Sequence, residues 1–236
     1  QERMGKRHDK RLVITVDGPA GVGKSTVSQE LAKRMSYIYL DTGALYRAVA
    51  YKVKQCGLAL EADGKIFELC QKIKISCEMV NDNMKISVDK EDITDKIRTE
   101  EIGLLASKVS ALSMVRKALL SVQRDAGKVG GIVAEGRDMG TVVFPDADVK
   151  FFMSADVKER TKRRYDQLLE KGISCDYDDI QRRLEERDCQ DVERNISPLK
   201  PAMDAVVIDT THMGIDEVVE DMMKGIAKKV ASSNLG

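Results

Sequence analysis

The stretch that most constrains this chain is Gly18-Pro-Ala-Gly-Val-Gly-Lys-Ser25, where two glycines bracket four residues and are followed by lysine and a hydroxyl. This spacing predicts a phosphate-binding loop, or P-loop, provided that a strand precedes it and a helix follows it. Residues 12–16 form a short β-branched run, and Val27, Leu31 and Met35 recur at helical spacing. The sequence therefore predicts the strand, loop and helix in the required order.

The residue types in this loop suit phosphate chemistry. Glycines at 18, 21 and 23 allow tight turns whose N–H groups point at phosphate oxygens, beside a positively polarised helix N-terminus. We expect Lys24 to bridge the β- and γ-phosphates of a nucleotide and the Ser25 hydroxyl to hold Mg²⁺. A glycine-rich turn that caps a helix by accident is the alternative. The predicted contacts with the nucleotide phosphates are Gly18, Pro19, Ala20, Gly21, Val22, Gly23, Lys24, Ser25 and Thr26.

Composition narrows the class of protein. A length of 236 residues suits one domain with an insertion or two small domains, and 42% hydrophobic with 33% charged residues is ordinary for a soluble protein. A formal net charge of zero argues against a nucleic-acid or anionic-membrane surface as the main function.

Two further features bear on the compartment. The basic residues 1–11 lack the apolar segment of a signal peptide, so we expect a cytoplasmic protein. Five cysteines without a C-x-x-C pair predict reduced thiols rather than zinc ligands or a disulfide framework.

Strand candidates alternate with helix candidates, which predicts an α/β fold with a parallel sheet. The helical pattern at 102–126 has a break near 111–114, and a final helix spans about 215–230. Between about 60 and 98 the pattern changes to alternation on both sides of 80–83, which predicts an inserted β-hairpin with a helix at 66–73. The five strand candidates are 12–16, 37–40, 131–135, 149–153 and 205–209.

Two consecutive helices before the last strand carry arginines on one face. In the first, Arg160, Arg163 and Arg164 fall at i, i+3 and i+4. The second helix, from 178 to about 194, repeats this spacing with Arg183, Arg187, Asp191 and Arg194. We interpret these faces as an anion-gripping flap, and the alternative is a pair of solvated faces with i,i+4 ion pairs.

A P-loop alone leaves the class of protein open. The chain has no Asn-Lys-x-Asp guanine signature, no Ser-Gly-Gly transporter signature and too little sequence beyond the core for a motor. The discriminating parts are Asp41-Thr-Gly-Ala-Leu-Tyr-Arg47, Glu135-Gly-Arg-Asp-Met-Gly-Thr141 and the arginine faces. A nucleoside monophosphate kinase needs these parts because it holds a second nucleotide opposite ATP and closes over both.

With these motifs the sequence closely resembles the bacterial cytidylate kinases, from about Leu12 to Val230. Four segments in the family's order carry the resemblance: 17–26, 41–47, 136–147, and Glu-Arg-Asp at 186–188 leading to Arg194. It implies a P-loop core with a five-stranded parallel sheet flanked by helices, a small inserted NMP-binding domain and a short helical lid. The implied boundaries are core 11–59, NMP-binding domain 60–98, core 99–153, lid 154–172, and core with the C-terminal helix 173–232.

The resemblance also implies roles for individual residues. Ser107, Arg116 and Asp138 would read cytosine, with the carboxylate accepting from the exocyclic amine; uracil carries a carbonyl there and would be rejected. The remaining implied substrate contacts are Thr42, the acceptor-phosphate ligands Arg47, Arg137 and Arg194, and the ribose-binding pair Arg187 and Asp191. The implied catalytic set is Lys24, Arg137 and the lid residues Arg160, Arg163 and Arg164.

Plainer interpretations remain open for several of these residues. Ser107 is also compatible with a tolerated polar residue inside a helix, Arg116 with a surface charge, and Asp138 with a partner of Arg137. Tyr46 is expected to pack rather than react. Glu135 is a candidate for orienting Mg²⁺-bound water, and Asp209 is expected to be a turn residue.

The predicted reaction is phosphorylation of CMP or dCMP by ATP with Mg²⁺. The acceptor phosphate is already ionised, so catalysis would consist of positioning and charge neutralisation. We expect a monomer that binds these nucleotides and neither nucleic acid nor membrane. The alternatives are another acceptor (UMP, dTMP or AMP) or an ATP-dependent switch that contacts a protein partner; a nucleic-acid module fits least.

Overall fold

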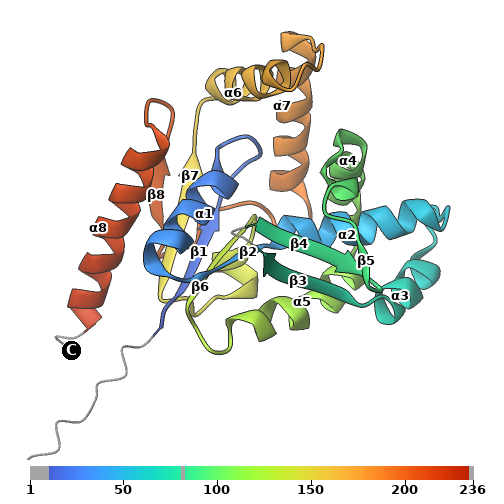
Figure 1. The fold of residues 1–236 in the computed structure, drawn as a ribbon, viewed down its shortest axis with the longest axis horizontal. Helices are drawn as coiled ribbons and strands as arrows, with labels where there is room; N and C mark the ends of the chain where they lie inside the picture. Colours follow the sequence, from blue (N-terminus) through green and yellow to red (C-terminus); the bar gives the residue numbers. More distant parts are fainter. Residues whose placement is uncertain (1–10, 81–82, 234–236) are drawn as a thin grey trace, which may run out of the picture.

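The computed structural model describes residues 11–80 and 83–233, and its centre is a five-stranded parallel sheet (Figure 1). The strand order is β2-β6-β1-β7-β8 and every pairing is parallel. This confirms the predicted sheet. The strands are β1 Val13–Asp17, β2 Ile38–Asp41, β6 Ile132–Gly136, β7 Val149–Ser154 and β8 Val206–Asp209.

Helices flank this sheet, and buried hydrophobic residues lie on both of its faces: Val133 of β6 belongs to one cluster, and its neighbours Ile132 and Ala134 belong to another. α1 (Lys24–Met35) buries Val27 and Leu31 in the same hydrophobic cluster as Ile14 of the central strand. α8 (Ile215–Ser233) contacts α1 and adds Met222 to the cluster. Burial of these aliphatic side chains supplies most of the favourable free energy of folding, at roughly 25 cal/mol per Å² of apolar area. The predicted amphipathic stripes therefore face the sheet.

The other described helices lie between β2 and β8 in the chain. The predicted break between two helices falls at Ala111 and Leu112, where Leu112 is extended with φ −78° and ψ 121°. A π-helical turn, Met139–Val143, follows β6. The helices are α2 Thr42–Gln55, α4 Glu100–Ser110, α5 Ser113–Gly127, α6 Val157–Glu170 and α7 Tyr177–Glu193.

The segment between α2 and α4 forms a small antiparallel sheet of order β3-β4-β5. β3 (Ile75–Val80) pairs with β4 (Asn83–Val88), as the alternating pattern predicted; residues 81 and 82 of the expected turn lie outside the described residues. β5 (Glu91–Asp92) is a third strand that was not predicted. α3 (Asp63–Lys72) begins three residues before the expected helix and buries Ile66 in the shared core.

The parallel arrangement decides where the site lies. Because all five strands run in one direction, their carboxyl ends meet at one edge, where α/β proteins hold their ligands. Buried acidic residues lie at or near the ends of three of these strands: Asp17 on β1, Asp41 on β2 and Glu135 on β6. Each is buried, so each must find a hydrogen-bond partner.

Candidate active site

A large open cleft lies at this edge of the sheet, with a cavity volume of about 890 Å³. Residues 20–27 form one part of its wall, and α4 with the residues after β6 forms another. α6 and α7 also contribute, through residues such as Arg164 and Arg187. The volume is at the upper end of the range for small-molecule sites, and the wall is rich in arginine.

The phosphate-loop backbone adopts the conformation that its glycines permit. Gly21 and Gly23 have φ of +73° and +94°, in the left-handed region that favours glycine. A Cβ on Gly18 would lie 2.3 Å from the carbonyl oxygen of Met153, so no larger residue fits. Gly23 caps α1 without a side-chain hydrogen bond, which leaves the first amides of α1 available to an anion.

Lys24 is buried at the base of this loop. Its Nζ donates to the carbonyl oxygen of Pro19 at 2.7 Å. Burial lowers the pKa of Lys24 to about 7, and the positive charge of Arg137 acts in the same direction. An anion bound between these cations would reverse that effect by favouring the charged amine.

Glu135 connects β6 to the beginning of α1. Its Oε1 accepts hydrogen bonds from Ser25 Oγ at 2.7 Å and from the Tyr39 hydroxyl at 2.5 Å. Thr42 Oγ1 donates to the Glu135 carbonyl oxygen at 2.7 Å. Burial and the nearby Asp41 carboxylate raise the pKa of Glu135. Its Oε2 is buried and has no hydrogen-bond partner among the described residues, so one carboxylate oxygen remains for a ligand.

The three predicted base-reading residues all line the cleft. Arg116 and Asp138 form a buried ion pair, and Arg116 Nη1 also donates to the carbonyl oxygen of Ser110 at 3.1 Å. Arg116 is therefore not a surface charge, and Asp138 pairs with it rather than with Arg137. Ser107 lies on the preceding helix, α4, and lines the same cavity.

Tyr46 belongs to this group as well. The Arg116 guanidinium carbon lies 5.5 Å from the centroid of the Tyr46 ring, within cation–π distance. The ring is buried in the main core cluster, so the expectation that Tyr46 packs is consistent with its position. Packing against Arg116 also limits where that guanidinium can lie.

Four arginines and two carboxylates form the next part of the cleft. Arg47 pairs with Asp41 at 2.7 Å, and Arg137 pairs with Asp191 at 2.7 Å. Arg194 lies 3.8 Å from the same Asp191. Burial lowers the pKa of Arg187 to about 10, and Arg137 acts in the same direction. This group carries an excess of positive charge.

Several donors in this group have no partner within the described part of the chain. They are Arg47 Nε, Arg187 Nε and Arg194 Nη2, all buried. Unpaired buried donors are costly, and ligand anions satisfy such donors in binding sites. The arrangement is therefore suited to hold a phosphate group.

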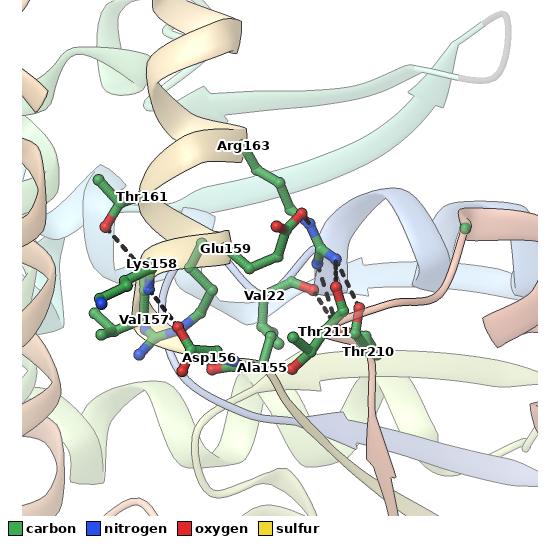
Figure 2. Close-up of polar contacts among 12 residues, drawn as sticks. Val22, Ala155, Asp156, Val157, Lys158, Glu159, Thr161, Arg163, Thr210 and Thr211 are labelled. Atoms are coloured by element: carbon green, nitrogen blue, oxygen red, sulfur yellow. Dashed lines mark hydrogen bonds and ion pairs between the residues drawn. The ribbon is translucent and has the colours of Figure 1, made fainter.

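The three predicted lid arginines have different surroundings. Figure 2 shows the Arg163 guanidinium directed at the loop after β8, where its Nη2 donates to the Thr210 carbonyl oxygen at 2.6 Å. Its Nε donates to Glu159 Oε1 at 3.2 Å. Arg164 lines the cleft and donates to Gln167 Oε1 at 2.7 Å.

Arg160 is held away from the cleft lining. It is 5% exposed, its Nη1 donates to the Ala20 carbonyl oxygen at 2.9 Å, and its Nη2 pairs with Asp188 at 2.7 Å. Gly18 and Pro19 likewise are absent from the described residues that line the cleft, although Pro19 contacts Lys24. Helical spacing placed the three arginines near one another, but Arg160 lies a turn earlier, where α6 packs against the loop.

Three site residues were missed by sequence reasoning. Asp41 had a local signal, since it precedes a helix and caps α2 by accepting from the Ala44 amide at 2.9 Å. Tyr39 and Asp17 had none, because their partners lie far along the chain. Asp17 accepts from the amides of Met139 and Gly140, each at 2.8 Å.

Comparison with known proteins identifies close relatives. The model of the cytidylate kinase family matches residues 14–228. The chain is 45% identical to the cytidylate kinase of Geobacter sp. (strain M21) over 99% of this chain and 100% of that protein. It is 46% identical to the cytidylate kinase of Coxiella burnetii (strain RSA 493 / Nine Mile phase I) over 96% of each.

Solved structures with a similar fold are more distant in sequence. An uncharacterized protein from Eubacterium ventriosum aligns with a TM-score of 0.51 at 13% identity, covering 93% of this chain and 99% of that one. A gluconokinase from Sinorhizobium meliloti aligns with a TM-score of 0.50 at 12% identity, covering 96% of each. These likenesses support the fold alone.

Proposed function

This chain belongs to the cytidylate kinase family, and from that premise we propose which part of its cleft binds ATP and which part binds CMP during ATP-dependent CMP phosphorylation. The γ-phosphorus of ATP forms a bond to a phosphate oxygen of CMP while its bond to the β–γ bridging oxygen breaks, giving ADP and CDP. This assignment of the two parts rests on the buried Arg116–Asp138 pair, which lies in the same cleft as the phosphate loop. One cleft thus offers both a triphosphate cradle and a polar base-reading pair. We propose that dCMP reacts in the same way.

The phosphate loop forms the donor half of the site. The amides of residues 20–26 and the start of α1 would hold the β- and γ-phosphates. Lys24 would exchange its hydrogen bond to Pro19 for one to phosphate oxygens, which restores its full charge. The loop then offsets negative charge on both sides of the bond that breaks.

The surroundings of Ser25 fit Mg²⁺. The Ser25 hydroxyl and the unpartnered Oε2 of Glu135 are oxygen donors, the type that Mg²⁺ prefers. Within the described residues no cluster of three or more His, Cys, Asp or Glu side chains could hold a metal, so nucleotide phosphates and water would complete the coordination. When bound, the ion would neutralise charge on the phosphates.

The acceptor half is assigned to the remaining arginines and carboxylates. Asp138 would accept from the 4-amino group of cytosine, while Arg116 and Ser107 would meet the ring acceptors. A uracil carbonyl would face the carboxylate without a hydrogen, which disfavours UMP. The unpartnered donors of Arg47 and Arg194 favour a role as ligands of the CMP phosphate. We assign the other acceptor contacts to Thr42, Arg137, Arg187 and Asp191.

The lid is assigned to residues 154–172, with Arg163 and Arg164 supplying charge to the transferred phosphoryl group. Arg163 would leave the Thr210 carbonyl when the lid closes, since a charged phosphate is the stronger acceptor. Arg160 was implied to be catalytic, but we assign it to bracing the phosphate loop, because it is buried away from the residues that line the cleft and binds Ala20 and Asp188. We retain residues 60–98 as the proposed NMP-binding domain within a core of 11–59, 99–153 and 173–232.

We further propose a cytoplasmic monomer that binds these nucleotides and no nucleic acid. The formal net charge of zero supports the last point, since nucleic-acid-binding proteins concentrate positive charge. No described helix is long and apolar enough to cross a membrane.

An acceptor panel tests this assignment. ADP release would be measured with Mg-ATP and CMP, dCMP, UMP, dTMP or AMP, for the wild type and for Asp138→Ala. We expect CMP and dCMP alone to stimulate turnover and the variant to lose that preference. Equal use of UMP or AMP would refute the base-reading set, and hydrolysis that is independent of any acceptor would favour the ATP-dependent switch.

A further inference from the structure

Asp17 joins the two halves of the site although it does not line the cleft. It is the last residue of β1 and directly precedes Gly18, the first residue of the phosphate loop. Its side chain is directed to the other half: Oδ1 accepts from the Met139 amide and Oδ2 from the Gly140 amide, each at 2.8 Å. These two residues directly follow Asp138, the proposed cytosine reader.

The chemistry of this contact requires a carboxylate. Two adjacent amides at the start of the π-helical turn each donate to a different oxygen of Asp17. Asparagine would offer one acceptor oxygen and would direct an N–H group at the second amide, and serine would offer a single oxygen. An ionised carboxylate is the side chain that accepts both bonds.

Hydrogen bonds to the Asp138 carbonyl oxygen close the turn that Asp17 holds. The Asp138 carbonyl oxygen accepts from the Val142 amide at 2.9 Å and from the Val143 amide at 3.2 Å. On its side-chain end, Asp138 pairs with Arg116, which is held by the Ser110 carbonyl oxygen. The position of the Asp138 carboxylate thus depends on the main chain that Asp17 fixes.

The contact has an energetic cost, which favours a specific role over simple packing. Asp17 is 4% exposed, and burial raises its pKa to about 6 even though both amide bonds act in the opposite direction. A buried ionised carboxylate lowers stability unless its interactions compensate for the lost hydration. An apolar residue at the end of β1 would avoid that cost but would leave two buried amides unpaired.

We propose that Asp17 is a positioning residue for base discrimination, which acts by holding the Met139 and Gly140 amides so that Asp138 meets the cytosine amine. The inference rests on the proposed function of Asp138. It links the strand that carries the phosphate loop to the specificity of the opposite half. The side chain itself does not line the cleft, so it would touch neither nucleotide.

The test compares Asp17→Asn with Asp148→Asn as a matched control. Asp148 Oδ2 accepts from the Val13 amide at 2.8 Å, so it is a carboxylate bonded to the opposite end of the same strand. For each variant we would measure kcat/KM for CMP and UMP, KM for ATP and the unfolding temperature. We expect Asp17→Asn to lower the CMP-to-UMP preference about tenfold through KM for CMP, the scale of one disturbed buried hydrogen bond.

The expected pattern separates positioning from stability. KM for ATP should change less than about twofold in Asp17→Asn, because the phosphate-loop amides are not its partners, and Asp148→Asn should keep the wild-type preference whatever its stability. If Asp17→Asn does not fold, the same measurements would be made on Asp17→Ser, whose hydroxyl oxygen can accept a hydrogen bond from one of the two amides. An unchanged CMP preference in the folded variant, with only a lower unfolding temperature, would overturn the proposal.

A third variant separates this inference from the proposed function on which it rests. Asp138→Asn should abolish the preference, and Asp17→Asn combined with it should cause no further loss of discrimination. An unchanged preference in Asp138→Asn would refute the base-reading assignment itself. Loss of preference in Asp138→Asn but not in the Asp17 variants would refute only the positioning role.

Discussion

The Arg160 guanidinium donates to the carbonyl oxygen of Ala20, with 2.9 Å between Nη1 and the oxygen. The contact ties α6 to the middle of the phosphate loop. The same guanidinium pairs with Asp188 of α7 at 2.7 Å, so one side chain connects three segments of the cleft wall. This relationship distinguishes Arg160 from the two other arginines of its helix.

Replacing Arg160 by methionine should therefore act on stability and ATP binding. The change leaves Asp188 without its cation, and its Oδ1 already has no partner among the described residues. We expect the free energy of unfolding to fall by about 2 kcal/mol, below the usual cost of breaking a fully buried pair because Asp188 is partly exposed. KM for ATP should rise. Urea unfolding and initial-rate kinetics would measure both.

Arg164→Met is the matched control for that prediction. Arg164 lines the cleft and donates to Gln167 of its own helix, so its loss should lower kcat with little change in stability. The opposite distribution of effects between the two variants would show that Arg160, not Arg164, serves the transferred phosphoryl group.

Replacing Arg163 by lysine should lower kcat strongly. Arg163 is bound to the Thr210 carbonyl in this structure and is proposed to move to the phosphoryl group. Lysine retains the charge but lacks the planar fork, so we expect most of an arginine's contribution to be lost, on the order of 10³-fold. Rapid-quench measurement of CDP formation would separate chemistry from product release. Wild-type kcat in this variant would show that the planar guanidinium of Arg163 is not needed for phosphoryl transfer.

Tyr39→Phe should raise the Mg²⁺ concentration needed for half-maximal activity about tenfold, as is common when a partner of a metal-binding group is removed. The variant keeps the ring but removes the hydroxyl that donates to Glu135 Oε1 at 2.5 Å, so the carboxylate loses one of its two fixed contacts. Magnesium titrations of rate and calorimetry of Mg-ATP binding would report the change. Tyr51→Phe, near Glu91 outside the cleft, should leave both readouts unchanged.

The pH dependence of the free energy of unfolding should report the raised pKa of Asp17. Its pKa rises from 3.8 to about 6 on folding, so the folded state binds more protons between these values and stability falls as pH increases. Relative to Asp17→Asn, the wild type should lose about 2 kcal/mol of unfolding free energy between pH 4 and pH 7. Denaturant unfolding of both proteins across this range checks it. A constant difference between them would mean that Asp17 has an ordinary pKa.

Local signals in the sequence were sufficient to predict the main elements of the fold. The phosphate loop, the five strands and the break at Ala111 each follow from residues that are neighbours along the chain. The pattern of α6 likewise placed its arginines on one helix. It could not show that Arg160 would meet Ala20, because helical periodicity defines a face but not what packs against it.

The missed contacts share one physical cause. Asp17 meets Met139, and Tyr39 meets Glu135, only because the parallel register aligns the ends of β1, β2 and β6. Register is a property of the assembled sheet. β5 was not predicted for a different reason, since a strand of two residues is too short to show alternating polarity.

The centre of the sheet is formed by β1, which precedes the other four strands of this sheet along the chain. Ile14 of β1 lies opposite both Val133 of β6 and Val149 of β7, each more than a hundred residues later in the chain. A nascent chain must therefore keep β1 unpaired while the helices and the small antiparallel sheet between these strands are made. Such long-range closure slows folding and exposes apolar strands to aggregation. The phosphate loop that follows β1 acquires its two supporting neighbours, β6 and β7, only after β7 has left the ribosome.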